Sequence, residues 1–272
     1  MINAMKIAFT ADLHQPITPL WQIEKLVNEI LEFSPDVIIL GGDLGESVQD
    51  FEKCLRLFRK SFACPLLVFP GNHDLWVRRF SDSKKLWFEE LPNITKDSGC
   101  TWLEGNSHVQ NGIGIAGTIG WYDYSAVDRG IAYSDLHFAQ EKFNFNSDAL
   151  LVDWEWSDPE FASRVSGPFL DHLNTLDNNP TVKSIIAATH FPILEEQIHR
   201  DAAKSGWAFS NAYAGNLTLG NQVVKIKKLS HVLSGHTHIG KKGSITRNGL
   251  TPVSYQVLDA DYQKPALIGL AF

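Results

Sequence analysis

The sequence has 272 residues, of which 44% are hydrophobic and 20% are charged, and its formal net charge is −7. This composition is ordinary for a folded protein, and the length suits one domain over residues 1–272 with a modest insertion. The negative charge argues against nucleic acid as a partner, because binding its backbone requires a basic surface, but an anionic substrate stays compatible since bound divalent cations reverse the field of an acidic site.

The start of the chain lacks the basic, apolar and small-residue regions of a signal peptide. The sequence also has no run of about 18 apolar residues, so we expect no transmembrane helix and no membrane partner. Its three cysteines, Cys54, Cys64 and Cys100, form neither a metal-ligand pair nor a disulfide framework. A small odd number of cysteines suits a reducing compartment, and we expect a cytoplasmic protein.

The first half of the chain alternates between predicted strands and helices. Apolar runs predict strands at 6–11, 37–40 and 66–69. A helical period predicts a helix at 19–33, and Ser47 and Asp50 are suitable caps for a second helix. This order implies parallel strands joined by crossover helices, and ligand sites in such sheets lie at the carboxyl ends of the strands.

The second half has shorter predicted elements. Strands are predicted at 101–103, 109–110, 113–118, 182–189 and 231–233, and helices at 161–176 and within 216–228. Residues 122–160 are polar, aromatic and irregular, and we interpret them as an insertion near the functional site. The end of the chain has the pattern of an antiparallel β-meander with strands at 245–247, 253–258 and 267–272.

Five short segments rich in Asp, His and Asn each follow a predicted strand. They are Asp12-Leu13-His14, Gly42-Asp43, Gly71-Asn72-His73-Asp74, Thr189-His190-Phe191 and Gly235-His236-Thr237-His238. Their positions predict that all five lie on one rim of the fold, where carboxylate, imidazole and amide groups are suitable metal ligands. In an extended Asp-x-His or His-x-His stretch, alternate side chains point toward the same side, and the neighbouring glycines leave room for ions.

This ordered set of motifs resembles the calcineurin-like metallophosphoesterase superfamily, and it spans most of the chain, from Asp12 to His238. The resemblance implies an α/β fold, namely a four-layer α/β/β/α sandwich of the metallo-dependent phosphatase type. It further implies two divalent metal ions, with manganese, iron, zinc and nickel all compatible with mixed nitrogen and oxygen ligands.

The resemblance also assigns roles to individual residues. The first ion is expected to be held by Asp12, His14 and His238. The second ion is expected to be held by Asn72, His190 and His236, and Asp43 is expected to bridge both ions. His73 is expected to face the substrate as a catalytic residue, and Asp74 is expected to orient it through a hydrogen bond.

The implied reaction is hydrolysis of a phosphomonoester or phosphodiester bond in a small phosphorylated substrate. Two cations about 3.5–4 Å apart bind the phosphoryl group and lower the pKa of a bridging water, and the resulting hydroxide attacks phosphorus. A cationic His73 then stabilises the developing charge or protonates the leaving oxygen.

The motif set also resembles bacterial cyclic-nucleotide phosphodiesterases, so a small diester is one option. Purple acid phosphatases have a Tyr ligand where this sequence has Glu46, which argues against an iron–tyrosinate site.

Several alternatives stay open. A catalytically silent scaffold that binds protein partners is the alternative function, and the presence of His73 with all seven ligands favours the enzyme. His199 competes with His190 for one ligand position, whereas His231 is interpreted as a core or surface histidine. Candidates for contact with a substrate phosphate are Arg78, Arg79, Lys241 and Lys242. Candidates for a pocket that stacks a flat group, or else for the core, are Trp76, Trp121, Tyr122, Tyr124, Trp154, Trp156 and Trp207.

Overall fold

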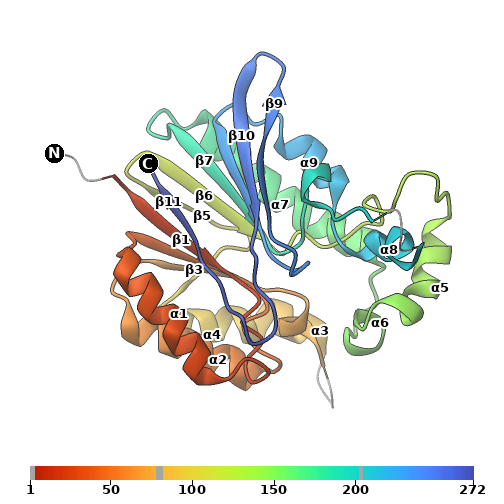
Figure 1. The fold of residues 1–272 in the computed structure, drawn as a ribbon, viewed down its shortest axis with the longest axis horizontal. Helices are drawn as coiled ribbons and strands as arrows, with labels where there is room; N and C mark the ends of the chain where they lie inside the picture. Colours follow the sequence, from red (N-terminus) through yellow and green to blue (C-terminus); the bar gives the residue numbers. More distant parts are fainter. Residues whose placement is uncertain (1–3, 78–81, 202–204) are drawn as a thin grey trace.

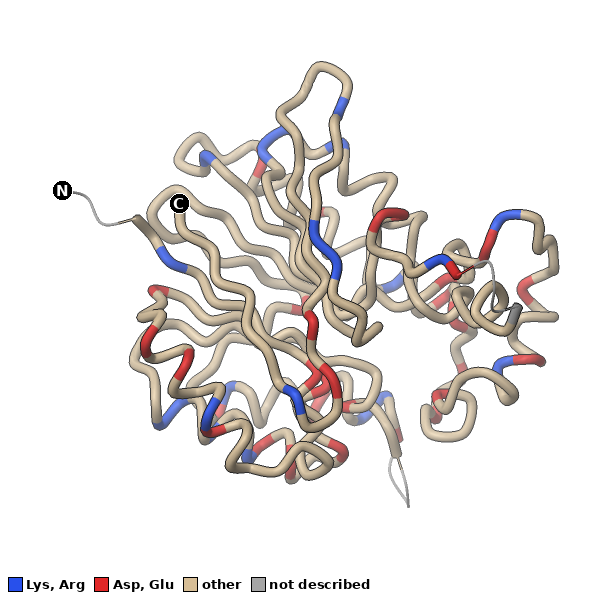
Figure 2. The backbone as a smooth tube through the Cα atoms, in the orientation of Figure 1, with Lys and Arg blue, Asp and Glu red and all other residues tan. Residues whose placement is uncertain are grey.

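Two β-sheets pack face to face, and helices cover the outer face of each sheet (Figure 1). The computed structural model describes residues 4–77, 82–201 and 205–272. The layer order is therefore helices, sheet, sheet and helices, which confirms the α/β/β/α sandwich expected from the motifs. Lys and Arg residues are spread over several elements in the view of Figure 2, on the outer helices as well as on the strands.

The first sheet has the strand order β11-β1-β2-β3-β4. Its parallel strands are β1 (Lys6–Thr10), β2 (Val37–Gly41), β3 (Leu66–Phe69) and β4 (Thr101–Trp102). The connecting helices are α1 (Leu20–Phe33), α2 (Val48–Ser61), α3 (Ser83–Lys85) and α4 (Leu91–Asp97), with a 3-10 turn at His73–Leu75 and a π-helical turn at Leu86–Glu90. The predicted βαβαβ order of the first half is thus confirmed.

The second sheet has the order β5-β6-β7-β8-β10-β9. Its strands are β5 (Ser107–Gln110), β6 (Ile113–Thr118), β7 (Ser184–Thr189), β8 (Leu229–Ser234), β9 (Lys241–Arg247) and β10 (Leu250–Val257). Its helices and turns are α5 (Asp135–Phe145), α6 (Asp148–Leu151), α7 (Asp158–Asn178), α8 (Ser205–Ser210), α9 (Leu217–Val223), and 3-10 turns at Glu195–Gln197 and Asn211–Tyr213. Among the described residues, none of these helices is long and apolar enough to cross a bilayer.

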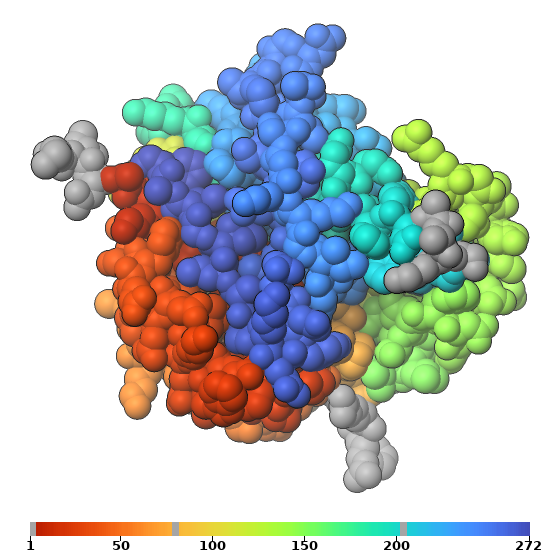
Figure 3. Space-filling view, viewed as in Figure 1, coloured from red at the N-terminus to blue at the C-terminus, as the bar shows by residue number. Residues whose placement is uncertain are grey.

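The C-terminal strands do not form the expected antiparallel meander. Strands β9 and β10 form an antiparallel hairpin, but β10 pairs in parallel with β8. The last strand, β11 (Ile268–Ala271), crosses to the first sheet and pairs antiparallel with β1. Figure 3 shows this C-terminal segment, in dark blue, lying against the N-terminal part in red and orange. The alternating apolar pattern of β11 is the same for either sheet, so the pattern could not identify the partner strand.

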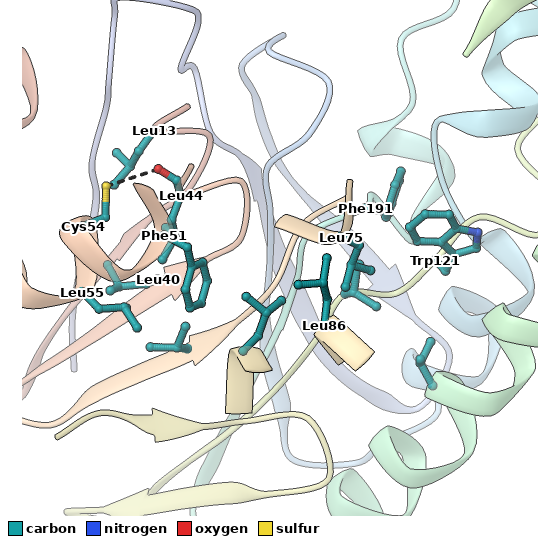
Figure 4. Close-up of a cluster of buried hydrophobic side chains, with 14 of the residues drawn as sticks. Leu13, Leu40, Leu44, Phe51, Cys54, Leu55, Leu75, Leu86, Trp121 and Phe191 are labelled. Carbon is teal, nitrogen blue, oxygen red and sulfur yellow. Dashed lines mark hydrogen bonds between the residues drawn. The ribbon is translucent and has the colours of Figure 1, made fainter. Parts of the chain in front are cut away.

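Alternation of side chains along the strands accounts for the four layers. Ile7 and Phe9 of β1 point into the core between the sheets, whereas Ala8 points toward the helices of the first layer. Likewise Ile186 of β7 faces the first sheet, and Ile185 faces α7 and α9. Figure 4 shows part of the core beneath α2, where Phe51, Cys54 and Leu55 meet the loops that follow β1 and β2.

The segment 122–160, expected to be irregular, contains α5 and α6. Two buried carboxylates anchor it. Asp158 accepts hydrogen bonds from Trp121 Nε1 (2.9 Å) and Tyr124 Oη (2.6 Å). It also forms an ion pair with Lys142 Nζ (2.7 Å). Asp148 accepts from other partners, described below. Because buried polar groups need such partners, these carboxylates fix the position of the segment against the sheets.

Candidate metal centre

All five polar segments lie in the loops that directly follow β1, β2, β3, β7 and β8, at one end of the two sheets. The structure brings their side chains together in three overlapping groups, in each of which the ligand atoms lie within 4.8 Å of one another. These groups are Asp12, His14 and His238; His14, Asp43 and His73; and Asp43, His190 and His236. The expectation of one common rim is therefore met.

The first group surrounds His14. Its Nε2 atom lies 3.2 Å from Nε2 of His238 and 3.7 Å from Oδ2 of Asp43. His238 Nε2 is 3.9 Å from Oδ1 of Asp12, whose carboxylate also accepts from the backbone N–H of His236. These atoms converge as the ligands of one small cation would.

The third group, which contains Asp43, His190 and His236, surrounds His190. Its Nε2 atom lies 3.2 Å from Oδ1 of Asn72 and 3.3 Å from Oδ2 of Asp43. The Oδ2 atom of Asp43 is thus close to a nitrogen of each group, because it also faces His14. One carboxylate oxygen in this position suits a bridge between two ions.

The outer ring nitrogens test whether this donor set fits metal ions. His190 Nδ1 lies 3.0 Å from the carbonyl oxygen of Gly41, and His14 Nδ1 lies 3.0 Å from Glu46 Oε1. Because these oxygens only accept, each Nδ1 carries the proton, which leaves the lone pair of Nε2 pointing into the cluster. The Nε2 atoms of His14 and His238, 3.2 Å apart, likewise converge as two ligands of one cation would. The residues present therefore fit two cations.

Electrostatics point the same way. Burial by itself would raise the pKa of Asp43, but His190, His73 and His14 hold its pKa well below the usual range. Burial would conversely lower the pKa of His190, and Asp43 outweighs it and raises that pKa to about 9. A buried carboxylate that favours a proton on its neighbour creates the negative potential that also favours a divalent cation.

The backbone of the loops is strained at the candidate ligands. Five of them have φ between 47° and 70°, namely Asp12, His14, Asp43, His236 and His238. Our explanation of Asp-x-His and His-x-His as extended stretches is therefore wrong, because alternate residues there adopt the left-handed conformation. Non-glycine residues rarely adopt this conformation, and it tends to persist at functional sites.

Two glycines are required by close approach. A Cβ atom at Gly71 would overlap Oδ1 of Asp43, and one at Gly235 would overlap the carboxylate of Asp12. Only a residue without a side chain leaves these carboxylates in place. This agrees with the expectation that the glycines make room in the site.

His73 lies at the edge of the site, with its side chain 12% exposed. Its backbone N–H donates to Oδ1 of Asp43 (2.9 Å), and its ring stacks on Trp76 with centroids 3.5 Å apart. Its Nδ1 atom lies 2.8 Å from Oε1 of Glu46. The ring is thus held on one face and at one nitrogen, and its other nitrogen, Nε2, lies 4.0 Å from Oδ2 of Asp43.

The expectation that Asp74 orients His73 is wrong. The carboxylate of Asp74 points inward and accepts from four backbone N–H groups, at 2.8 to 3.2 Å, in Asp43, Leu44, Gly45 and Gly71. The side chains of His73 and Asp74 diverge because both residues belong to the 3-10 turn His73–Leu75. Asp74 therefore ties the loop after β2 to the loop after β3, and it supports the site through the backbone.

Glu46 takes the role that the sequence suggested for Asp74. Its Oε1 atom accepts from His14 Nδ1 and from His73 Nδ1, so it connects a candidate ligand with the candidate catalytic histidine. Burial would lower the pKa of His73, but Asp43 and Glu46 outweigh it and raise that pKa. Since bound cations would neutralise Asp43, Glu46 is the group that continues to favour the imidazolium form. A carboxylate three residues after Gly42-Asp43, where purple acid phosphatases have Tyr, was the available signal.

A substitution tests the role of Glu46. Glu46→Leu removes the acceptor for both ring nitrogens and is expected to lower metal affinity or turnover by about 10–100-fold, as for other groups that orient metal-binding histidines. Glu46→Gln keeps one acceptor oxygen and is expected to lose less metal affinity and turnover than Glu46→Leu. Metal titration and steady-state rates of the three proteins check this order, and equal losses in both variants would contradict it.

Two other histidines and two lysines that were candidates lie outside the site. The ring of His199 packs against Trp207 and joins none of the groups. His231, which lies on β8, packs against Phe272. Lys241 Nζ donates to carbonyl oxygens of Ile198 and Glu196, and Lys242 is exposed on β9. Neither lysine lines the cavity over the centre. Arg78 and Arg79 lie outside the described residues.

A cavity of about 450 Å³ opens over the centre. Its lining includes Asp43, Asn72, His73, His236 and His238, together with five aromatic side chains: Trp76, Phe145, Trp207, Tyr213 and Tyr262. Trp76 and Trp207 thus line a pocket as one of our alternatives proposed. A larger cavity of about 740 Å³, next to α9 and β9, contains none of the candidate ligands.

The remaining aromatic candidates belong to the core. Trp121 and Tyr122 are fully buried, and their polar atoms donate to Asp158 and Asp148. Trp154 and Trp156 pack against Phe161, with ring centroids 4.2 and 5.7 Å apart. The pocket interpretation is therefore wrong for Trp121, Tyr122 and Tyr124, which are buried, while Trp154 and Trp156 are partly buried and line no part of the cavity over the centre.

Comparison with known proteins places the fold. A family described as calcineurin-like phosphoesterase matches residues 5–240. No curated protein matches the sequence. Similar solved structures include a phosphopantetheinyl hydrolase from Mycobacterium tuberculosis, with a TM-score of 0.70 and 17% identity over 97% of this chain and 92% of that chain. A dimetal phosphatase from Danio rerio has a TM-score of 0.58 and 11% identity over 99% and 93% of the two chains. PhoD has a TM-score of 0.53 and 11% identity over 97% and 57%.

Proposed function

Because the chain belongs to the calcineurin-like phosphoesterase family, we propose that it is a hydrolase that uses two divalent ions to cleave phosphomonoester or phosphodiester bonds. The observation that carries this proposal is the position of Asp43 between two convergent sets of ligand atoms. Asp12, His14 and His238 would hold one ion, and Asn72, His190 and His236 the other. When bound, such ions polarise the phosphoryl oxygens and lower the pKa of a water that attacks phosphorus.

The residues of the chain have distinct tasks in this proposal. Glu46 accepts from Nδ1 of His73 and thereby leaves Nε2 as the atom that meets the substrate. His73, favoured as the imidazolium, donates this proton to the leaving oxygen or stabilises its negative charge. Asp74 keeps the loops after β2 and β3 in register, so that Asp43 and His73 stay in contact.

The aromatic side of the cavity suggests what the leaving group looks like. Phe145 and Tyr262 are 42% and 44% exposed at its rim, and Trp76 lies deeper, against His73. Among the described residues that line this cavity there is no Lys or Arg. Stacking and apolar contact would therefore bind the alcohol part of the ester. We propose that the leaving group is organic and flat or apolar, rather than a second phosphate group.

The proposal is tested with p-nitrophenyl phosphate and its bis-ester, assayed with added manganese. Turnover of at least one ester that is lost with a chelator and restored by metal is the expected result. A panel of linear diesters, cyclic nucleotides and phosphopantetheinyl esters would then define the substrate, the last because the mycobacterial neighbour is named for it. Absence of turnover with metal demonstrably bound would favour a scaffold that binds protein partners.

A pair of phenylalanines on α5 tests the aromatic rim. Phe145→Ala is expected to raise KM for an aryl or nucleoside ester by about 2–13-fold, given roughly 0.5–1.5 kcal/mol for a stacked ring, and to leave small alkyl esters unchanged. Phe143→Ala is the matched control, because Phe143 is 63% exposed on the same helix and lines no part of this cavity. Equal effects on aryl and alkyl esters would refute a stacking role.

A further inference from the structure

Asp148 is a buried carboxylate at the start of α6, and it reaches the metal centre from the segment 122–160. It is 1% exposed. Its Oδ1 atom accepts from Nδ2 of Asn72 (2.9 Å) and from Nε1 of Trp76 (2.6 Å), and its Oδ2 atom accepts from the hydroxyl of Tyr122 (2.9 Å). All three donors are neutral, so the carboxylate is satisfied by hydrogen bonds alone.

The hydrogen bond to Asn72 determines which way its amide points. A carboxylate only accepts, so the Nδ2 side of the amide must face Asp148. Oδ1 then faces the opposite way, where it lies 3.2 Å from Nε2 of His190. A flipped amide would place two oxygens against each other and lose both the hydrogen bond and the ligand atom.

The same carboxylate also reaches the candidate catalytic histidine. Trp76 donates to Oδ1 of Asp148 and stacks on the ring of His73 at 3.5 Å. The residues just before Asp148, from Phe145 to Ser147, line the cavity. Asp148 therefore joins a ligand of the second ion, the support of His73 and the cavity wall.

We propose that Asp148 is a positioning residue that presents the carbonyl oxygen of Asn72 to the ion held by Asn72, His190 and His236. This proposal rests on the proposed function. Through Trp76 it also fixes the plane of the His73 ring. It contacts neither ion nor substrate. The segment 122–160 thereby completes the second metal site as well as forming a wall of the cavity.

Asp158 offers a matched control. It is also a buried carboxylate of this segment, 6% exposed, and it accepts from Trp121 Nε1 and Tyr124 Oη as Asp148 accepts from Trp76 and Tyr122. Its third partner is Lys142, and it has no bond to a candidate ligand or to Trp76 among the hydrogen bonds of the described residues. Loss of Asp158 should disturb the segment without releasing Asn72.

The experiment measures Mn²⁺ binding to metal-stripped protein by equilibrium dialysis, which does not depend on turnover. Asp148→Ala is expected to weaken one of the two equivalents of Mn²⁺ by about 10–100-fold and to leave the other unchanged. Asp148→Asn keeps one acceptor oxygen, is nearly isosteric, and is expected to recover most of this loss. Asp158→Ala should bind both equivalents of Mn²⁺ with the affinities of the parent protein. Circular dichroism checks that this variant is folded, and Asp158→Asn replaces it if it is not.

A double variant shows whether the effect passes through Asn72. Asn72→Ala should by itself weaken the same equivalent as Asp148→Ala does, and combining the two substitutions should weaken it no further. The proposal is overturned if Asp148→Ala binds both equivalents as the parent does, if the Asp158 variant is weakened equally, or if the two losses add. If the parent binds both equivalents but hydrolyses no ester, the proposed reaction fails while the positioning role stands.

Discussion

Asp43→Ala is expected to abolish turnover and to reduce the occupancy of both metal sites. Asp43 Oδ2 lies 3.7 Å from Nε2 of His14 and 3.3 Å from Nε2 of His190, so its removal takes a ligand from each set. Metal analysis of the dialysed protein, together with steady-state rates, checks both parts.

Asp12→Ala is the matched control for Asp43→Ala. Its carboxylate is equally buried, but among the groups of described residues it belongs only to the one with His14 and His238, and it accepts from the backbone of His236. It should therefore deplete the first site and leave most of the second. If Asp43→Ala instead keeps one site fully occupied, Asp43 does not bridge the two ions.

His73→Ala is expected to keep the metal content of the parent and to lower turnover by about 10²–10⁴-fold. Its ring meets the cavity, and its hydrogen bonds run to Glu46 and, through the backbone, to Asp43. The backbone contact to Asp43 survives the substitution, which is why the ions should remain. Loss of both ions in this variant would show that His73 is a ligand.

The leaving group separates the two possible tasks of His73. A p-nitrophenolate is stable without a proton, so an acid role predicts a smaller loss with p-nitrophenyl esters than with alkyl esters. Stabilisation of charge on the phosphoryl group predicts similar losses with both. His199→Ala is the control, since its ring packs against Trp207 and joins none of the metal groups, and it should retain metal and most of the rate.

Much of the site was predictable because its signals are local. Each segment follows an apolar strand, and strands that run in parallel carry the residues after them to the same edge of a sheet. The family resemblance then divided the residues between two ions. The structure adds the distances that make Asp43 the shared group, while the roles as ligands stay predictions.

Three features that the sequence did not reveal depend on which distant segments pack together. The partner of β11 is a choice between two sheets that the pattern of Ile268 and Leu270 does not encode. Trp121 is in the core because Asp158 of a later segment accepts its N–H. Nothing near Asp148 marks it as a partner of Asn72, which lies 76 residues earlier in the chain.

The exchange between Asp74 and Glu46 has a more local cause. Asp74 directly follows His73 in the sequence, whereas Glu46 lies 27 residues earlier and outside the motifs, so the sequence favours Asp74. The left-handed conformation of Asp43 turns the following loop so that Glu46 faces the histidine rings. Asp74 then lies under the backbone amides of that loop. Backbone conformation, which the residue types do not reveal, decided the roles.

Titration of metal-stripped protein with Mn²⁺, with bound metal and phosphoesterase rate recorded together, tests the central claim most directly. A dinuclear centre predicts that two equivalents bind and that the rate rises mainly with the second. Full activity after one equivalent, or no activity toward any ester of the panel after two, would contradict a hydrolase that needs both ions.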